Sequence, residues 1–139
     1  MAAPILEIRN LTVEFGTEDG VVHAVEGVSY ELHHGEVLGI VGESGSGKSV
    51  SMLSVLGLIP MPPGKIAAGE ALYKGQDLLT MPAKQLRELR GGEMAMIFQD
   101  PMTSLNPVFT IGDQIAEALT THHPDMKHDA ARARTIELL

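Results

Sequence analysis

The sequence contains 139 residues, about the length of one domain or of part of one, and 44% of them are hydrophobic. A net charge of −8 argues against sequence-independent binding of nucleic acid, which needs a basic surface. The absence of cysteine excludes disulfides and thiolate metal sites. We expect no signal peptide, and no apolar run approaches the ~20 residues that span a bilayer.

The first third of the chain is expected to begin with an antiparallel sheet that has one solvated face. Residues 11–15 and 28–32 alternate between apolar and polar side chains, which is the period-two pattern of a half-exposed strand. Between them, Asp19 and Gly20 form a pair that is favoured in tight hairpin turns. Residues 37–41 form an uninterrupted apolar run instead, which predicts a strand buried on both faces.

Residues 42–49 satisfy the phosphate-loop pattern G-x-x-x-x-G-K-[ST]. The apolar run before the loop and the helical spacing of residues 50–59 after it predict the strand–loop–helix context that this loop requires. Its glycines let backbone N–H groups turn inward around phosphate oxygens, and the start of the helix adds partial positive charge. In such a loop Lys48 meets the β- and γ-phosphates and the Ser49 hydroxyl ligates Mg²⁺.

The middle of the chain alternates short elements with turns. We expect a loop at 60–64, a short strand at 71–73 and a helix at 82–90 that ends at the Gly91-Gly92 pair. Residues 94–98 predict a second buried strand, and the composition of 99–107 predicts a loop.

Two further helices are expected toward the end. Thr110 is placed to cap the first, which has Asp113 in its first turn and carries one apolar stripe formed by Ile111, Ile115 and Leu119. Residues 129–139 predict the second, with Ala130, Ala133 and Ile136 near one face.

The phosphate loop and the segment Met96-Ile97-Phe98-Gln99-Asp100-Pro101-Met102-Thr103-Ser104-Leu105-Asn106-Pro107 together resemble the ATP-binding subunit of ABC transporters. More narrowly, they resemble the dipeptide/oligopeptide (or nickel) importer group, and the resemblance runs from Leu6 to about Leu139. It implies an α/β fold: a P-loop NTPase (ABC ATPase) core with an N-terminal antiparallel β subdomain. The β subdomain and core would occupy about residues 1–102, and the helical subdomain would start at about 103 and be cut within residues 103–139.

The resemblance also implies roles for particular residues, with ATP and Mg²⁺ as cofactors. Phe15 would stack on adenine, and Gln99 would reach Mg²⁺ and the attacking water, so Lys48 and Gln99 are the catalytic candidates. Ser49 and Gln99 are the candidate metal ligands. The candidate nucleotide-binding residues are Phe15, Gly42, Ser44, Gly45, Ser46, Gly47, Lys48, Ser49 and Val50.

Partners follow from the same resemblance. It implies membrane-spanning permease subunits and a second ATPase subunit, with the chain in the cytoplasm on the inner face of the cell membrane. No direct membrane insertion and no nucleic acid are expected. The loop at 99–107 would face the membrane subunits, and we expect it to be mobile in the isolated chain.

Several family features do not occur in these 139 residues. The signature motif, the acidic strand with the catalytic glutamate and the switch histidine are missing, so we expect ATP binding without useful hydrolysis. Residues 89–93 superficially resemble the signature Leu-Ser-Gly-Gly-Gln, but Arg90 and Glu93 replace its serine and glutamine, and we interpret them as a helix end. Two alternatives stay open: a small kinase with Asp100 as Mg²⁺ ligand, and a non-catalytic nucleotide-binding module. The histidine pairs at 33–34 and 122–123 are expected to be surface residues.

Overall fold

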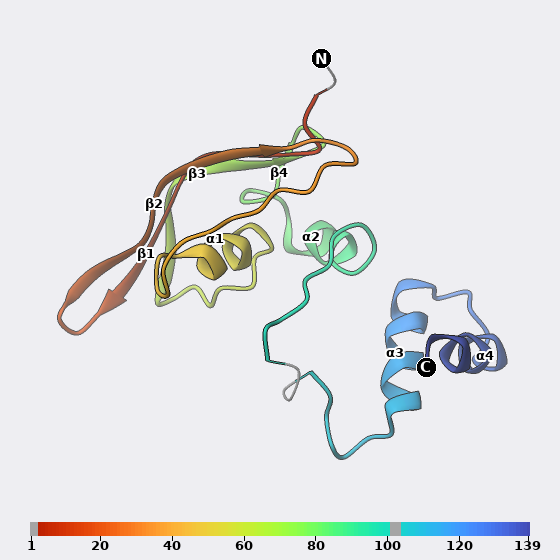
Figure 1. Cartoon of the computed structure of the whole chain (residues 1–139). Coiled ribbons are helices and arrows are strands. Elements are labelled where there is room, and N and C mark those ends of the chain that lie inside the picture. Colours follow the sequence, from red (N-terminus) through yellow and green to blue (C-terminus); the bar gives the residue numbers. More distant parts are fainter. Residues whose placement is uncertain (1–2, 101–103) are drawn as a thin grey trace. The chain divides into compact units, whose positions relative to one another are not determined.

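The computed structural model describes residues 3–100 and 104–139. These residues form two compact units, Met1–Leu86 and Arg87–Leu139, which are described one at a time (Figure 1). Three residues of the importer-like segment, Pro101, Met102 and Thr103, lie outside the described residues. The subdomain boundary expected near residue 102 stays a prediction.

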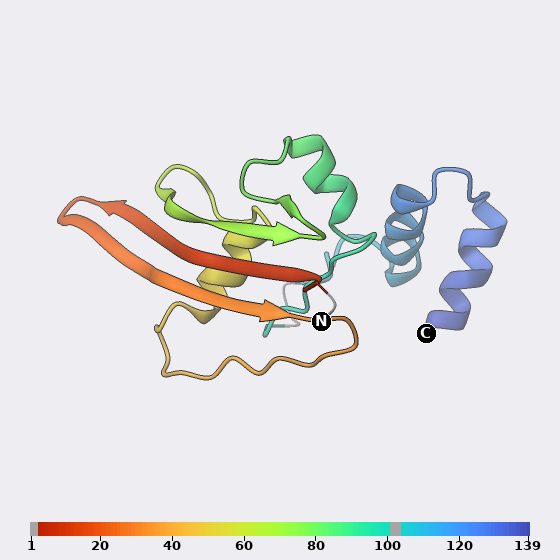
Figure 2. The same ribbon diagram turned by 90° about the horizontal axis from the view of Figure 1, so that it is seen from above.

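The first unit is built on an antiparallel sheet with the strand order β2-β1-β3-β4 (Figures 1 and 2). The expected hairpin is confirmed, because Thr17 pairs with Gly20 where one strand turns into the next. The strand expected at 71–73 is confirmed but begins seven residues earlier, at Gly64. The strands are β1 (Leu6–Thr17), β2 (Gly20–Leu32), β3 (Gly64–Tyr73) and β4 (Gln76–Asp77).

Helix α1 (Lys48–Val55) contacts β1 and β2 and covers part of the sheet (Figure 1). Its buried face carries two serines, Ser51 and Ser54, where apolar residues are usual. Burial is tolerated because each hydroxyl donates to a carbonyl one turn earlier in the helix, Ser51 to Lys48 at 2.8 Å and Ser54 to Val50 at 2.6 Å. Helix α2 (Ala83–Leu89) buries Leu86 and ends before Gly91, whose φ is 84°, so the expected helix end is confirmed.

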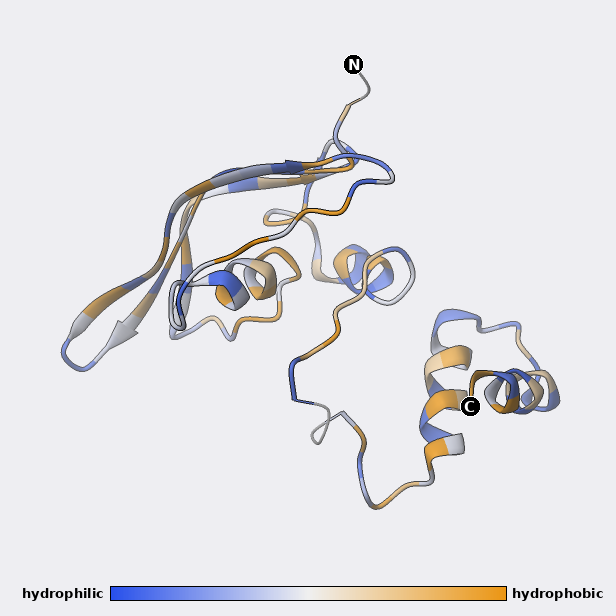
Figure 3. Ribbon diagram, in the orientation of Figure 1, coloured by the Kyte–Doolittle hydropathy of each residue, from blue (hydrophilic) through white to orange (hydrophobic). Residues whose placement is uncertain are grey.

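The expectation of two buried strands at 37–41 and 94–98 is wrong for this chain. Val37 and Val41 are 96% and 93% exposed, Ile97 is 97% exposed, and no described residue pairs with either segment apart from one bridge between Arg90 and Met94. In Figure 3 the segment between β2 and α1 is drawn without a strand arrow and is orange over part of its length. A parallel strand needs neighbours brought alongside by crossover connections, and within the described residues no strand runs beside these segments.

The second unit contains helices α3 (Ile111–His122) and α4 (His128–Leu138), which pack on each other. The predicted cap is confirmed, because the Thr110 hydroxyl accepts from the Asp113 backbone N–H at 3.1 Å. No helix within the described residues is both long enough and apolar enough to cross a membrane.

The residues that α4 buries are not the three expected near one face of it. Ala131 and Thr135 are the buried residues, whereas Ile136 is 66% exposed. Residues spaced by three, such as Ala130 and Ala133, drift around a helix that has 3.6 residues per turn, and a spacing of four keeps side chains closer to one line. Thr135 is accommodated because its hydroxyl donates to the Ala131 carbonyl at 2.8 Å.

Candidate functional site: the loop at 42–49

The loop at 42–49 leads directly into α1, which begins at Lys48. Gly45 and Gly47 have φ values of 82° and 88°, in the left-handed region that favours glycine. The Ser46 N–H donates to the Glu43 carbonyl at 3.2 Å and closes a turn inside the loop. The loop is therefore a tight turn joined to a helix N-terminus, an arrangement that favours anions.

The Lys48 ammonium is held over this loop by three of its oxygens. It donates to the carbonyls of Gly42 at 2.8 Å and Glu43 at 2.6 Å, and to the Ser46 hydroxyl at 3.2 Å. These bonds bend the long side chain back from the helix across the residues that precede it. Lys48, the only lysine of the motif, therefore holds its positive charge against the loop that precedes α1.

Two glycines of the loop stand where a side chain would collide. A Cβ at Gly42 would come 2.7 Å from the Ser46 hydroxyl oxygen, and a Cβ at Gly47 would run into the Ala24 carbonyl of β2. Gly47 also caps α1. The Ala24 carbonyl of β2 therefore lies directly against Gly47, the residue at which the loop ends and α1 begins.

An open cavity of about 520 Å³ lies beside the loop. Its walls are β2, the exposed segment 38–42 and the start of α1, and β2 contributes Val25, Val28 and Tyr30. Burial raises the pKa of the Tyr30 hydroxyl, and a hydrogen bond between this side chain and Ser51 acts in the opposite direction. The volume is within the ~300–1,000 Å³ range of small-molecule sites.

The remaining candidate residues divide between the two units. Phe15 is half-buried on β1 opposite Val22 and Gly64, and a Cβ at Gly64 would come 3.2 Å from its ring. In the same unit Ser44 and Ser49 are exposed and Val50 is half-buried. Gln99 and the neighbouring Asp100 are exposed in the second unit, in a stretch without regular secondary structure. Their roles at the nucleotide stay predictions.

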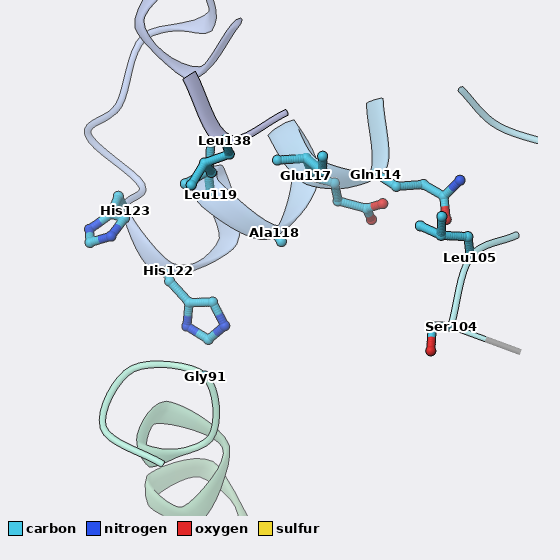
Figure 4. Close-up of a pocket in the computed structure, with 11 residues that line it drawn as sticks. Gly91, Ser104, Leu105, Gln114, Glu117, Ala118, Leu119, His122, His123 and Leu138 are labelled. Atoms are coloured by element: carbon cyan, nitrogen blue, oxygen red, sulfur yellow. The ribbon is translucent and has the colours of Figure 1, made fainter. Parts of the chain in front are cut away.

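A second cavity, of about 530 Å³, lies within the second unit (Figure 4). The His122 imidazole reaches toward Gly91 and occupies the space that a Cβ there would need. Gln114 ties the preceding loop to α3, because it donates to the Asn106 carbonyl at 2.9 Å and accepts from the Asn106 N–H at 2.8 Å. Across the described parts of the chain, no group of three or more histidine, aspartate or glutamate side chains is arranged to hold a metal ion.

Sequence reasoning missed the residues of β2 that contact the loop. Ala24 is an extra residue in β2, since Val13 pairs with Val25 and Glu14 with His23. Such a bulge leaves no trace in the alternation of apolar and polar residues. The burial of Ser51 could not be predicted either, because a serine in a helix looks the same in sequence whether it is buried or exposed.

Comparison with known proteins identifies the family. A sequence profile described as ABC transporter matches residues 25–138. The oligopeptide transport ATP-binding protein OppD of Bacillus subtilis is 50% identical over 97% of this chain, and the dipeptide transport ATP-binding protein DppD of Haemophilus influenzae is 52% identical over the same share. A putative peptide import ATP-binding protein of Brucella abortus is 50% identical over 99% of it. The chain spans 37%, 40% and 41% of these three relatives.

The fold has counterparts among solved structures. The dimeric structure of a bacterial ABC transporter cassette aligns with a TM-score of 0.80 over 95% of this chain and 54% of its own, at 22% identity. A second structure of that cassette, described as a post-hydrolysis state bound to ADP and Pi, aligns with a TM-score of 0.77. This likeness shows an ABC ATPase fold.

Proposed function

This chain belongs to the ABC transporter family, and from that premise we propose that residues 42–49 bind the phosphates of MgATP. The observation that carries the proposal is the position of the Lys48 ammonium, held by three oxygens over the turn that opens into α1. A phosphate chain entering this turn would replace the loop oxygens as partners of the ammonium. It would meet the partial positive charge of the helix N-terminus at the same place.

Three further residues complete the proposed site. Ser49, exposed in the first turn of α1, would ligate Mg²⁺ from one side, and Gln99 would reach the metal and the attacking water. Phe15 would stack on the adenine. Its half-buried ring is held against the start of β3 at Gly64, which would leave its other surface for the base.

We propose further that the whole protein is the ATPase subunit that powers an importer of peptides or similar solutes, with this chain as its N-terminal part. Support comes from the relatives named above, of which the chain spans about two fifths. The proposal includes membrane-spanning permease subunits and a second ATPase subunit as partners. It places the chain in the cytoplasm on the inner face of the cell membrane.

Calorimetric titration with MgATP tests the adenine contact of this site. Base–aromatic stacking contributes about 1–3 kcal/mol, so Phe15→Ala is expected to weaken binding roughly 5- to 150-fold. Phe15→Tyr and Phe15→Trp keep a ring and should bind like the parent chain. Equal affinity of the parent and Phe15→Ala chains would contradict the stacking role and leave the phosphate contacts as the whole site.

A further inference from the structure

We propose that residues 37–41 form an interface between two copies of this chain, in which the two segments pair as antiparallel strands. Two observations carry the proposal. The segment is apolar and has no strand partner among the described residues, and its sequence has nearly the same pattern in both directions. The inference does not depend on the proposed nucleotide site, because it concerns the apolar run before the loop and not the loop itself.

The backbone of residues 37–41 has no partner within the described parts of the chain. Before the segment, the Glu36 N–H donates to the His33 carbonyl at 3.1 Å, and after it the next backbone donor is the Ser46 N–H in the loop. None of the five residues pairs with a described strand. Unpaired N–H and C=O groups of this kind are a template for pairing with another chain.

The side chains of this segment are exposed although all of them are apolar. Val37 and Val41 are almost fully exposed. Leu38 and Ile40, which line the cavity beside the loop, are 40% and 41% exposed. Because successive side chains of a strand point to opposite faces, the two valines would share one face and Leu38 and Ile40 the other. Association would therefore remove apolar surface from water.

The sequence of the segment fits a second copy of itself. In an antiparallel pair centred on Gly39, Val37 of each copy lies opposite Val41 of the other. Leu38 lies opposite Ile40 in the same way. Three of the four side chains are β-branched, the type that strands favour. The pairing is isologous, since both copies contribute the same surface around a twofold axis at Gly39.

The charges at the two ends of the segment favour this antiparallel arrangement. It places Glu36 opposite Gly42 of the other copy, and Glu43 opposite Gly35. A parallel pair in register would instead place each glutamate opposite the same glutamate of the other copy, and like charges directly opposite destabilise a sheet. The net charge of −8 on each copy opposes association in general, so the dimer should be tighter at higher salt concentration.

Disulfide trapping tests both the interface and its direction, because the chain has no cysteine of its own. Position 39 accepts a side chain, since no atom lies within 4 Å of the place where a Cβ on Gly39 would be. In the full 139-residue chain, Gly39→Cys should form a cross-linked dimer on mild oxidation. Opposite residues of an antiparallel pair are about 4.5–5.5 Å apart at their Cα atoms, which is within the range of a disulfide.

Cysteines away from the twofold axis distinguish the antiparallel arrangement from a parallel one. Val37→Cys should not cross-link with itself, because four residues of strand, about 13 Å, separate the two cysteines along the antiparallel pair. A mixture of Val37→Cys and Val41→Cys chains should cross-link. Val108→Cys, at an exposed valine in the loop before α3, is the control for random collisions and should give no dimer.

Analytical ultracentrifugation measures the same association without a disulfide. The parent chain should sediment increasingly as a dimer as its concentration rises. Val37→Lys should weaken the dimer by about tenfold or more, because each dimer loses two valine contacts. Val108→Lys makes the same change outside the segment and should leave the association unchanged.

Three outcomes would overturn the inference. A parent chain that stays monomeric, with slow hydrogen exchange at residues 37–41, would show that another segment of the same chain covers them. Cross-linking of Val37→Cys with itself as readily as Gly39→Cys would contradict the antiparallel register. Equal trapping of Val108→Cys, or equal weakening by Val37→Lys and Val108→Lys, would assign the association to non-specific aggregation.

Discussion

The purified 139-residue chain is expected to bind MgATP while hydrolysing it at a rate near the uncatalysed background. Hydrolysis requires a group that orients or deprotonates the attacking water and charge stabilisation of the transferring phosphoryl group. Lys48, Ser49 and Gln99 supply only part of this set. By analogy with the loss of an arginine finger, the missing groups reduce the rate by a factor of about 10³–10⁵.

Steady-state phosphate release measures this rate, with Lys48→Ala as the control for contaminating ATPases. Turnover near ~1 s⁻¹, at the lower end of ordinary enzyme rates, would contradict the prediction if Lys48→Ala abolished it. That result would favour the alternative of a small kinase, in which Asp100 is the Mg²⁺ ligand.

Replacing Gly47 with alanine is expected to be among the most damaging single substitutions in this chain. The left-handed backbone at φ 88° costs a residue with a Cβ about 1–2 kcal/mol, and the collision with the Ala24 carbonyl adds an overpacking cost of about 1–3 kcal/mol. The free energy of unfolding should fall by about 2–5 kcal/mol, the sum of these two costs. Nucleotide binding should be lost with it, because β2 and α1 must separate at the phosphate loop.

Gly45→Ala is the matched comparison for this substitution. Gly45 has nearly the same backbone conformation, with φ at 82°, but no atom lies within 4 Å of the place where its Cβ would be. It should lose only the ~1–2 kcal/mol of backbone strain. Equal losses in the two variants, measured by denaturant unfolding, would contradict the claim that the β2 contact restricts position 47.

The parts of the fold that the sequence predicts well are those whose partners lie nearby in the chain. The β1–β2 hairpin follows from the alternation around Asp19-Gly20, and the start of α3 follows from Thr110 and Asp113. Both depend on contacts between residues close in sequence. The strand expected at 37–41 depends instead on neighbouring strands from distant segments of the chain. Apolar composition alone does not supply the hydrogen-bonded partner that a strand needs.

The features of the site also divide into those that depend on residues close in sequence and those that depend on distant ones. The motif at 42–49 predicts the tight turn, the left-handed glycines and the helix start, because these properties are local to the loop. It says nothing about Ala24, whose carbonyl on β2 lies against Gly47 of the loop. That contact depends on a bulge and on the sheet register, which alternation does not encode.

Thermal or denaturant unfolding with and without MgADP is the most direct test of the central claim that residues 42–49 bind nucleotide phosphates. At a hundredfold excess over its dissociation constant, MgADP should raise the free energy of unfolding of the parent chain by about 2.7 kcal/mol. Lys84→Ala, which removes an exposed lysine on α2, should keep this gain, and Lys48→Ala should lose most of it. An equal gain in the Lys48→Ala chain, or none in the parent, would contradict the claim.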